Sequence, residues 1–317
     1  KELYKIILNL KKQNKSIIFI SHKLDEVLEI CDEFTVLRDG RKVISNLIKN
    51  TNKNDLISYM VGRKIDKIFP KKYVNLGAPI LKVKNLSKKN QFKNINFDLR
   101  KKEILGFYGL VGSGRTEIMQ TIFGINNFDS GNILFNETPF QAYKPIEAIK
   151  KGIVYLSEER QNLGIFAKMS VKDNLVLTTL EQISRTFIRN ELKEQSMAIN
   201  IQEKLNIKIS YWNQLVENLS GGNQQKTVIG KWLATKPKIL ILDEPTKGID
   251  IASKSSIHKF MGELVNQGMT IILVSSELPE IMGMCDRVVV LYKGLIRSIL
   301  DITKTSSEEI LTYASGE

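Results

Sequence analysis

The chain has 317 residues, of which 42% are hydrophobic, and a formal net charge of +13 from 47 Lys and Arg against 34 Asp and Glu. This length can bury a sizeable core, whereas the longest apolar runs, at 239–242 and 288–292, are far shorter than the ~20 residues of a membrane-spanning helix. The basic residues are scattered and no aromatic-basic stripe is present, which argues against a nucleic-acid-binding protein. The alternative role for the excess charge is attraction to the anionic inner surface of a membrane.

Residues 1–62 are predicted to form a short series of helices and strands. The stretch 63–79 that follows contains Pro70, Gly77 and Pro79, which interrupt regular structure, so it is predicted to be a linker. In chain order, the part before the linker is expected to contain helices at 1–13, 23–31 and 54–61 and strands at 17–20, 34–37 and 41–45.

Residues 80–317 are predicted to form a larger α/β domain. Strands at 80–83 and 95–99 are expected to belong to a small antiparallel subdomain. Residues 165–213 lack the apolar runs of core strands and are predicted to be mostly helical. The α/β core is expected to consist of strands at 104–108, 153–156, 239–242, 271–274 and 288–291, with a helix at 115–123.

An internal repeat relates the two ends of the chain. The segments 16–40 and 270–294 align without a gap, at an offset of 276 minus 22, or 254 residues. This period fits a nucleotide-binding domain and not a solenoid unit. We therefore expect the end of a first copy before the linker, a complete second copy after it, and a longer parent protein, since the chain does not begin with Met. Cys31 and Cys285 hold equivalent positions in the two copies, which predicts free thiols and no disulfide.

A glycine-rich turn joins the strand at 104–108 to the following helix. Residues 109–116 read Gly-Leu-Val-Gly-Ser-Gly-Arg-Thr, which is the phosphate-binding pattern G-x-x-x-x-G-K-[ST] with Arg115 in place of lysine. Glycines let the backbone wrap a phosphate, and the Thr116 hydroxyl is a candidate Mg²⁺ ligand. Arginine is a longer, planar fork, so we expect nucleotide binding to survive while chemistry at the γ-phosphate suffers. The alternative is a glycine-rich turn that holds no ligand.

Two adjacent carboxylates end the apolar run at 239–242. Asp243 and Glu244 are followed by Pro and Thr, the arrangement with which phosphate-loop enzymes hold Mg²⁺ and orient a water. Asp243 is therefore a candidate Mg²⁺ ligand and Glu244 a candidate catalytic residue. Upstream, residues 219–226 read Leu-Ser-Gly-Gly-Asn-Gln-Gln-Lys. In this segment, here called the signature, Ser220 and two glycines precede a helix and expose N–H groups and a hydroxyl to an anion.

Together these motifs resemble the ATP-binding cassette (ABC) family. They are most similar to the second cassette of the ribose, galactose and xylose class of sugar importers, whose ATPase is one chain with two fused cassettes. The resemblance implies an α/β fold, the ABC P-loop nucleotide-binding fold, with an antiparallel β subdomain and a helical subdomain that touches a transmembrane permease. It is carried by Gly-x-Gly-Arg-Thr-Glu at 112–117, Ser-Glu-Glu-Arg at 157–160, the signature, Leu-Asp-Glu-Pro-Thr-Lys-Gly-Ile-Asp at 242–250 and Val-Ser-Ser-Glu-Leu-Pro-Glu at 274–280.

The resemblance also assigns roles to single residues. His22 stands where the family's switch histidine contacts the γ-phosphate, and its counterpart in the second copy is Ser276, while Glu158 replaces the glutamine of the Q-loop. The second cassette's own site is thus implied to be degenerate, whereas its signature would close on ATP held by the first cassette. Arg160 and Lys247 remain either motif residues or solvated surface charges. The implied ATP-binding residues are Gly109, Gly112, Ser113, Gly114, Arg115, Thr116, Glu117, Glu158, Ser220, Gly221, Gly222, Asp250 and Ser276, with Thr116 and Asp243 as Mg²⁺ ligands and Glu244 and His22 as catalytic residues.

The implied function is that of the ATP-hydrolysing subunit of a bacterial sugar importer at the cytoplasmic face of the membrane, with ATP and Mg²⁺ as cofactors. The implied partners are transmembrane permease subunits, a second cassette in a dimer and, indirectly, a periplasmic or surface sugar-binding protein, without nucleic acid. The sugar is not encoded here, because specificity lies in the binding protein and the permease. Two alternatives remain: a tandem ABC protein that acts on ribosomes or nucleic acid, and a nucleotide-binding scaffold without turnover.

Overall fold

The chain folds into two compact units in the computed structural model. The structure describes residues 2–21, 24–38, 40–61, 69, 75–183 and 190–317. The first unit consists of residues 1–68 together with 249–256, and the second consists of residues 69–248 together with 257–317.

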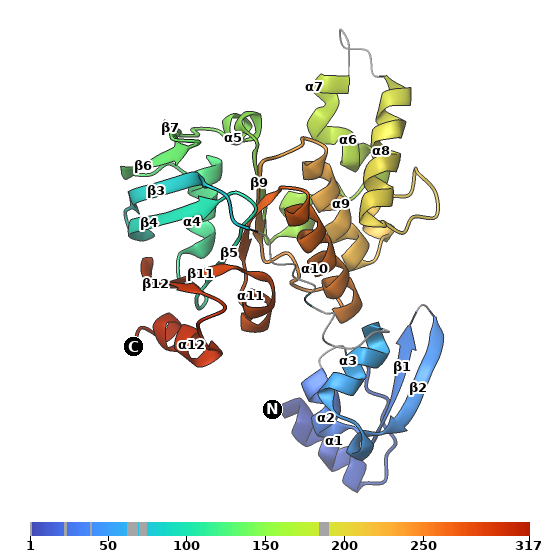
Figure 1. Ribbon diagram of the computed structural model, residues 1–317. Helices are drawn as coiled ribbons and strands as arrows, with labels where there is room; N and C mark the ends of the chain where they lie inside the picture. The colour runs from blue at the N-terminus through green and yellow to red at the C-terminus, as the bar shows by residue number, and fades with distance from the viewer. Residues whose placement is uncertain (1, 22–23, 39, 62–68, 70–74, 184–189) are drawn as a thin grey trace. The chain divides into compact units, whose positions relative to one another are not determined.

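The first unit contains a β-hairpin and short helices (Figure 1). Its elements before the linker are α1 (Glu2–Lys12), α2 (Leu24–Ile30), β1 (Glu33–Arg38), β2 (Arg41–Leu47) and α3 (Lys53–Val61). The two strands pair antiparallel. A small apolar core forms from Leu24, Phe34, Val36 and Leu56. The predicted helices and the two hairpin strands are thus present within one or two residues of their expected ends.

The segment 17–20 does not form the predicted strand. Residues 16–21 belong to no helix or strand, and the side chains of Ile18 and Ile20 are each 93% exposed. A strand is held by hydrogen bonds to a neighbouring strand, and in the described part of the chain none pairs with this segment. The prediction is therefore wrong here, because the apolar run has neither a ladder nor a core to join.

The second unit is built on a six-stranded sheet with the order β12-β11-β5-β10-β9-β8. The first five strands in chain order run parallel, and β12 runs antiparallel to β11. Strands β5, β9 and β10 are buried along their whole length, as expected for parallel strands covered on both faces. The strands are β5 (Ile104–Tyr108), β8 (Ile153–Leu156), β9 (Ile239–Asp243), β10 (Thr270–Val274), β11 (Arg287–Tyr292) and β12 (Leu295–Asp301).

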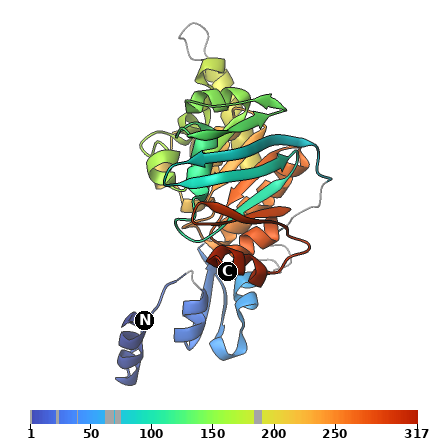
Figure 2. The same cartoon turned by 90° about the vertical axis from the view of Figure 1, so that its left-hand side faces the viewer.

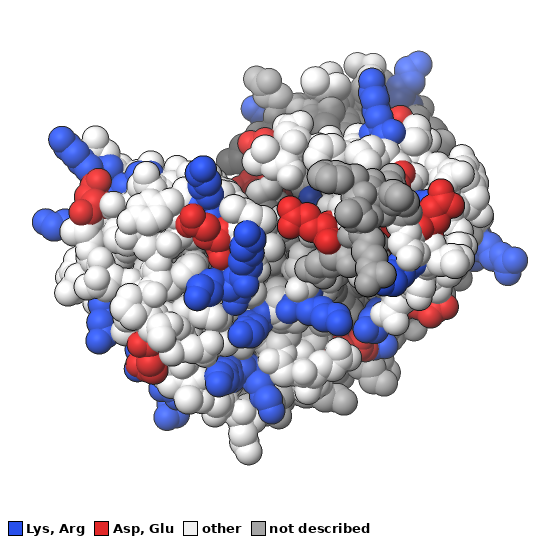
Figure 3. Space-filling model, turned by 90° about the horizontal axis from the view of Figure 1, so that it is seen from above, with Lys and Arg blue, Asp and Glu red and all other residues white. Residues whose placement is uncertain are grey.

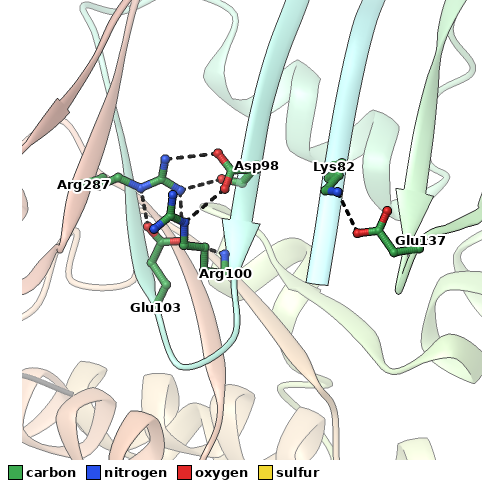
Figure 4. Close-up of polar contacts among 6 residues, drawn as sticks. All are labelled: Lys82, Asp98, Arg100, Glu103, Glu137 and Arg287. Carbon is green, nitrogen blue, oxygen red and sulfur yellow. Dashed lines mark hydrogen bonds and ion pairs between the residues drawn. The ribbon is translucent and has the colours of Figure 1, made fainter. Parts of the chain in front are cut away.

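A four-stranded antiparallel sheet shares its core with the parallel sheet (Figure 2). Phe97 meets Phe107 of β5 edge to face, with ring centroids 5.1 Å apart. Arg287 Nε lies 2.7 Å from Oε1 of the buried Glu103, and its Nη1 lies 3.1 Å from Asp98 Oδ1, so that one guanidinium ties the two sheets together (Figure 4). In the order β4-β3-β6-β7, the strands are β3 (Pro79–Lys88), β4 (Phe92–Arg100), β6 (Ser130–Phe135) and β7 (Thr138–Pro139).

A helical group confirms the prediction for residues 165–213. Helices α6, α8 and α9 pack on one another, on the side of the second unit away from the antiparallel sheet (Figure 1). Within the described ranges, no helix is both long and apolar enough to cross a membrane. The remaining helices are α4 (Arg115–Phe123), α5 (Pro145–Lys151), α6 (Val171–Val176), α7 (Leu180–Ile183), α8 (Glu191–Leu205), α9 (Gly221–Leu233), α10 (Ile251–Asn266), α11 (Leu278–Met284) and α12 (Ser307–Ser315).

The charged side chains are mixed over the surface shown in Figure 3. Lys and Arg project from many parts of this face, and Asp and Glu lie among them. The excess of 13 positive charges is therefore interspersed with carboxylates on this face.

Candidate nucleotide-binding site

The glycine-rich turn between β5 and α4 has a backbone shape that glycine adopts without strain. The φ angle is +79° at Gly112 and +95° at Gly114, which is the N-cap of α4. A Cβ at Gly109 would lie 2.5 Å from the Leu291 carbonyl oxygen. Glycine at these positions allows the tight turn in which backbone N–H groups face a phosphate.

Two neighbouring turns hold the glycine-rich turn in place. Gly294, between β11 and β12, donates its N–H to the Ser113 carbonyl (2.9 Å) and accepts at its own carbonyl from the Lys93 N–H (2.9 Å). A Cβ at Gly294 would lie 2.4 Å from the Gln91 carbonyl oxygen, and one at Gly114 would lie 3.3 Å from the Gly294 Cα. Three backbone turns therefore meet where there is no room for side chains.

Two buried oxygens at the site have no hydrogen-bond partner in the described part of the protein: Ser113 Oγ and Asp243 Oδ1. Their residues are 4% and 0% exposed. The other oxygen of Asp243 accepts a hydrogen bond from the Tyr155 hydroxyl (2.8 Å). A buried polar atom without a partner is unfavourable, and a phosphate with its metal ion would supply the missing partners. The donor set fits these groups.

The chemistry of the donors suits Mg²⁺ in particular. Among the described residues, no three or more His, Cys, Asp or Glu side chains gather as a metal cage. Mg²⁺ is usually held by one or two carboxylates together with waters and substrate phosphates. A single buried aspartate beside the Thr116 hydroxyl, which hydrogen-bonds it, matches that pattern.

Burial raises the pKa of both carboxylates at the end of β9. For Asp243, burial outweighs the hydrogen bonds from Tyr155 and Thr116. For Glu244, burial outweighs the hydrogen bond from Ser276 and the positive charge of Arg115. The structure thus brings Ser276 to Glu244, as the sequence predicts for two residues of one site. A cation bound here would favour the ionised form of both groups.

Arg115 reaches across the site to the end of β10. Its Nη1 donates to the Ser275 carbonyl (2.7 Å) and lies 3.6 Å from Glu244 Oε1, with only 10% and 8% of the two side chains exposed. The guanidinium therefore faces the carboxylate that the sequence predicts to be catalytic. A paired carboxylate is a weaker proton acceptor than a free one.

The segment that follows β8 lies at the edge of the site. Glu158 forms an ion pair with Lys247, and the hydrogen bond that Lys247 donates to this carboxylate raises the pKa of Lys247. Lys247 is thus an exposed charge with a carboxylate partner. Arg160 begins a π-helical turn at 160–164, where burial lowers the pKa of its guanidinium. Glu117 lies half-buried in the first turn of α4.

The signature forms the start of α9. Ser220 Oγ accepts hydrogen bonds from the Asn223 N–H (3.4 Å) and from Asn223 Nδ2 (3.1 Å). Gly221 and Gly222 make the first helical turn. In the described ranges, no hydrogen bond or ion pair joins this segment to the glycine-rich turn or to Glu244, so the structure does not bring the signature into that group.

Two further residues are predicted for the site, Asp250 and His22. Asp250 caps α10, since its carboxylate accepts from the Ser253 N–H (2.9 Å) and hydroxyl (2.6 Å), and it belongs to the first unit. His22 lies outside the described residues. Its predicted contact with a γ-phosphate therefore stays a prediction.

Sequence reasoning missed Tyr155 and Ser275. A tyrosine within the otherwise aliphatic strand 153–156 is a usable signal, because a buried hydroxyl needs a partner. Ser275 contributes its backbone carbonyl to Arg115, and no residue type predicts such a contact. Phe92, at the start of β4, is 3% exposed and belongs to the core.

Comparison with known proteins relates the chain to ATP-binding proteins of ABC transporters. Residues 92–247 match the ABC transporter family model. The chain is 45% identical over 315 residues to the ribose import ATP-binding protein RbsA 2 of Rhizobium johnstonii, with 99% of this chain and 62% of that protein covered. It is 43% identical over 314 residues to the ribose import ATP-binding protein RbsA of Geobacillus kaustophilus, with 99% and 64% covered. The chain therefore spans less than two thirds of the length of these relatives.

Solved structures confirm the predicted fold. One is an ABC transporter cassette described as a dimer in a post-hydrolysis state with ADP and phosphate, which is 19% identical with a TM-score of 0.61 over 70% of this chain and 98% of that one. The α/β P-loop cassette fold with antiparallel and helical parts, expected from the motifs, is thus the fold observed. The chain belongs to the ABC transporter family of ATP-binding proteins.

Proposed function

We propose that this chain is the ATP-binding part of a sugar importer and that it binds ATP with Mg²⁺ between the glycine-rich turn and Asp243. The observation that carries the proposal is the pair of buried oxygens, Ser113 Oγ and Asp243 Oδ1, that lack a partner in the described residues. Ser113 follows the buried strand β5, and Asp243 is the last residue of the buried strand β9 in the same sheet. Ligands of such sheets bind outside the carboxyl ends of the strands.

Each residue of the site has a role in this proposal. The N–H groups of the turn from Gly109 to Gly114 bind phosphate oxygens, and Thr116 and Asp243 hold Mg²⁺, which supplies charge neutralisation when bound. Glu244 would orient and deprotonate a water. Because Arg115 pairs with Glu244 and Ser276 replaces a histidine, we expect this site to bind ATP and to turn it over slowly.

The partners of the parent protein follow from the relatives, which are named as ribose import proteins. We propose that the helical group α6–α9 contacts a transmembrane permease at the cytoplasmic face of the membrane. The signature at the start of α9 would close on ATP held by another cassette in a dimer, which accounts for its separation from the chain's own glycine-rich turn. A sugar-binding protein outside the cell would deliver the monosaccharide, and no nucleic acid takes part.

Titration of a fluorescent ATP analogue with and without Mg²⁺ tests the ATP site. We expect Asp243→Asn to raise the Kd in Mg²⁺ at least ~10-fold, the low end of the loss seen when a group supporting a metal is removed. The matched control is Glu263→Gln, an exposed carboxylate on α10, which should leave the Kd unchanged. Turnover of ATP by the unsubstituted chain should stay below about 1 s⁻¹. Binding that ignores both Mg²⁺ and Asp243→Asn would contradict the proposal.

A further inference from the structure

Phe69, within the linker 63–79, docks on α10 and α11. It is the first residue of the second unit. Its ring lies 5.0 Å, centroid to centroid, from the imidazole of His258 on α10. A Cβ added at Gly283 on α11 would lie 2.3 Å from the Phe69 ring. The ring therefore fills the space that a side chain at position 283 would take.

The imidazole that contacts Phe69 belongs to a buried hydrogen-bonded pair. His258 Nε2 donates to Glu280 Oε1 over 2.7 Å, and the two side chains are 3% and 2% exposed. Burial alone would raise the pKa of Glu280, but the hydrogen bond from His258 and the nearby Ser275 and Thr246 hydroxyls lower it. The other carboxylate oxygen, Glu280 Oε2, is buried without a hydrogen-bond partner in the described part of the protein.

Two of these side chains adjoin the residues of the nucleotide site. Ser275 gives its carbonyl to Arg115, and its hydroxyl accepts from the Glu277 N–H (3.0 Å). Thr246 follows Glu244 by two residues and is 2% exposed. The Glu280 N–H in turn donates to the Glu277 carbonyl (3.0 Å), so Glu280 is linked through Glu277 to the Ser275 segment that holds Arg115.

We propose that Phe69, His258 and Glu280 form a brace that positions the Ser275 segment at the nucleotide site, and so couples the linker to nucleotide binding. The inference rests on the proposed ATP site. The three are positioning residues, because they act on Arg115 through the Ser275 segment. The coupling is reciprocal: docking of Phe69 strengthens nucleotide binding, and bound nucleotide strengthens the docking of Phe69.

A double-mutant cycle tests the docking of Phe69. In the unsubstituted chain, Gly283→Ala should lower the Tm, because the new Cβ collides with the ring. In the Phe69→Ala background the collision is absent, and alanine is a better helix former than glycine, so Gly283→Ala should leave the Tm unchanged or raise it. Equal losses in both backgrounds would overturn the placement of Phe69.

Nucleotide affinity and hydrogen exchange test the coupling. Phe69→Ala should raise the Kd of the Mg²⁺ and fluorescent ATP analogue about fivefold and speed exchange in residues 274–280 of the nucleotide-free chain, while Phe69→Leu should restore most of both. Glu280→Gln should act in the same direction. The control Phe128→Ala removes another half-buried phenylalanine that packs on the core, and should change neither.

A failure of the brace can be distinguished from a failure of the proposed ATP site. If the unsubstituted chain binds the analogue but Phe69→Ala and Phe128→Ala have the same Kd and exchange, the brace is wrong and the ATP site stands. If the unsubstituted chain binds no analogue, the proposed function is wrong, and unchanged exchange at 274–280 in Phe69→Ala would then dismiss the brace as well.

Discussion

The guanidinium of Arg115 is paired with the carboxylate of Glu244, with 3.6 Å between Nη1 and Oε1. The same Nη1 holds the Ser275 carbonyl at 2.7 Å. The residue that replaces the usual lysine of the glycine-rich turn thus ties the end of β9 to the end of β10. The site therefore keeps its glycine-rich turn, while the carboxylate that we propose as the base is held by a guanidinium.

Replacement of Arg115 by lysine should partly free Glu244. Lysine is a compact point charge without the planar fork, so it cannot hold the Ser275 carbonyl and Glu244 together. We expect ATP turnover by Arg115→Lys to rise toward ~100-fold, the low end of what a positioned general base contributes, with a smaller change in Kd. Steady-state phosphate release measures this rise, and the double variant with Glu244→Gln should abolish it. A rise that persists in the double variant would exclude Glu244 as the base.

Removal of the Tyr155 hydroxyl should weaken Mg²⁺ binding. Tyr155 orients Asp243 through a 2.8 Å hydrogen bond, and loss of a group behind a metal ligand costs about tenfold or more in metal affinity. In Tyr155→Phe, the Mg²⁺ concentration that gives half-maximal nucleotide binding should rise about tenfold, while binding in EDTA stays the same. Tyr143→Phe, on a residue 62% exposed, serves as the control. Equal Mg²⁺ requirements in the two variants would count against Asp243 as a ligand.

Ser220→Ala should separate stability from nucleotide binding. Loss of this N-cap costs about 1 kcal/mol, which lowers the Tm by roughly 2–4 °C in a domain of this size. The Kd for ATP should not change, because no contact joins the signature to the glycine-rich turn in the described ranges. Differential scanning fluorimetry measures the change in Tm, and the nucleotide titration measures the Kd. A weaker Kd would show that the signature serves the chain's own site.

Because of Lys231, the free energy of unfolding should rise with pH in the alkaline range. Burial lowers its pKa to about 8, and its Nζ donates to the Gly164 carbonyl. Since the folded pKa lies below that of the unfolded chain, the folded state binds fewer protons between about pH 8 and 10.5, and stability rises with pH across that window. Relative to Lys231→Met, the unfolding free energy of the unsubstituted chain should rise by at most about 1.4 kcal/mol per pH unit.

Urea titrations at pH 7 and pH 9.5 measure the difference. The control is Lys238→Met, which removes an exposed lysine and should show the same pH slope as the unsubstituted chain. A Lys231→Met slope equal to that of the control would mean that Lys231 keeps its proton in the folded protein.

Apolar runs predicted the buried strands well and the amphipathic ones poorly. Strands β5, β8, β9 and β10 agree with prediction within one residue at each end, because short, mostly apolar runs have few alternatives to a buried strand of a parallel sheet. Strand β12 was not predicted, since its residues alternate between exposed and half-buried positions and it exists through its pairing with β11. The segment 17–20 shows the converse: an apolar run without a neighbour forms no strand.

The candidate site was predictable as far as contiguous motifs reach. The glycine-rich turn, Asp243 and Glu244 stand out by residue type and spacing. The partners that tune them do not, because they come from distant positions: Tyr155 lies 88 residues before Asp243, and Ser275 lies 160 residues after Arg115. The parallel pairing of β8 with β9 and of β5 with β10 brings them together, and no local pattern specifies that register.

The close contacts among Gly114, Gly294 and Gln91 have a consequence for the kinetics of nucleotide binding. A phosphate loop pinned by two other turns through the Gly294 amide and carbonyl has already lost its conformational freedom during folding, so a ligand need not order it. Association should then be a single fast step with no slow phase of loop closure. The motion that follows binding would start at the ends of β9 and β10, where Arg115 must release Glu244, while the glycine-rich turn keeps its shape throughout.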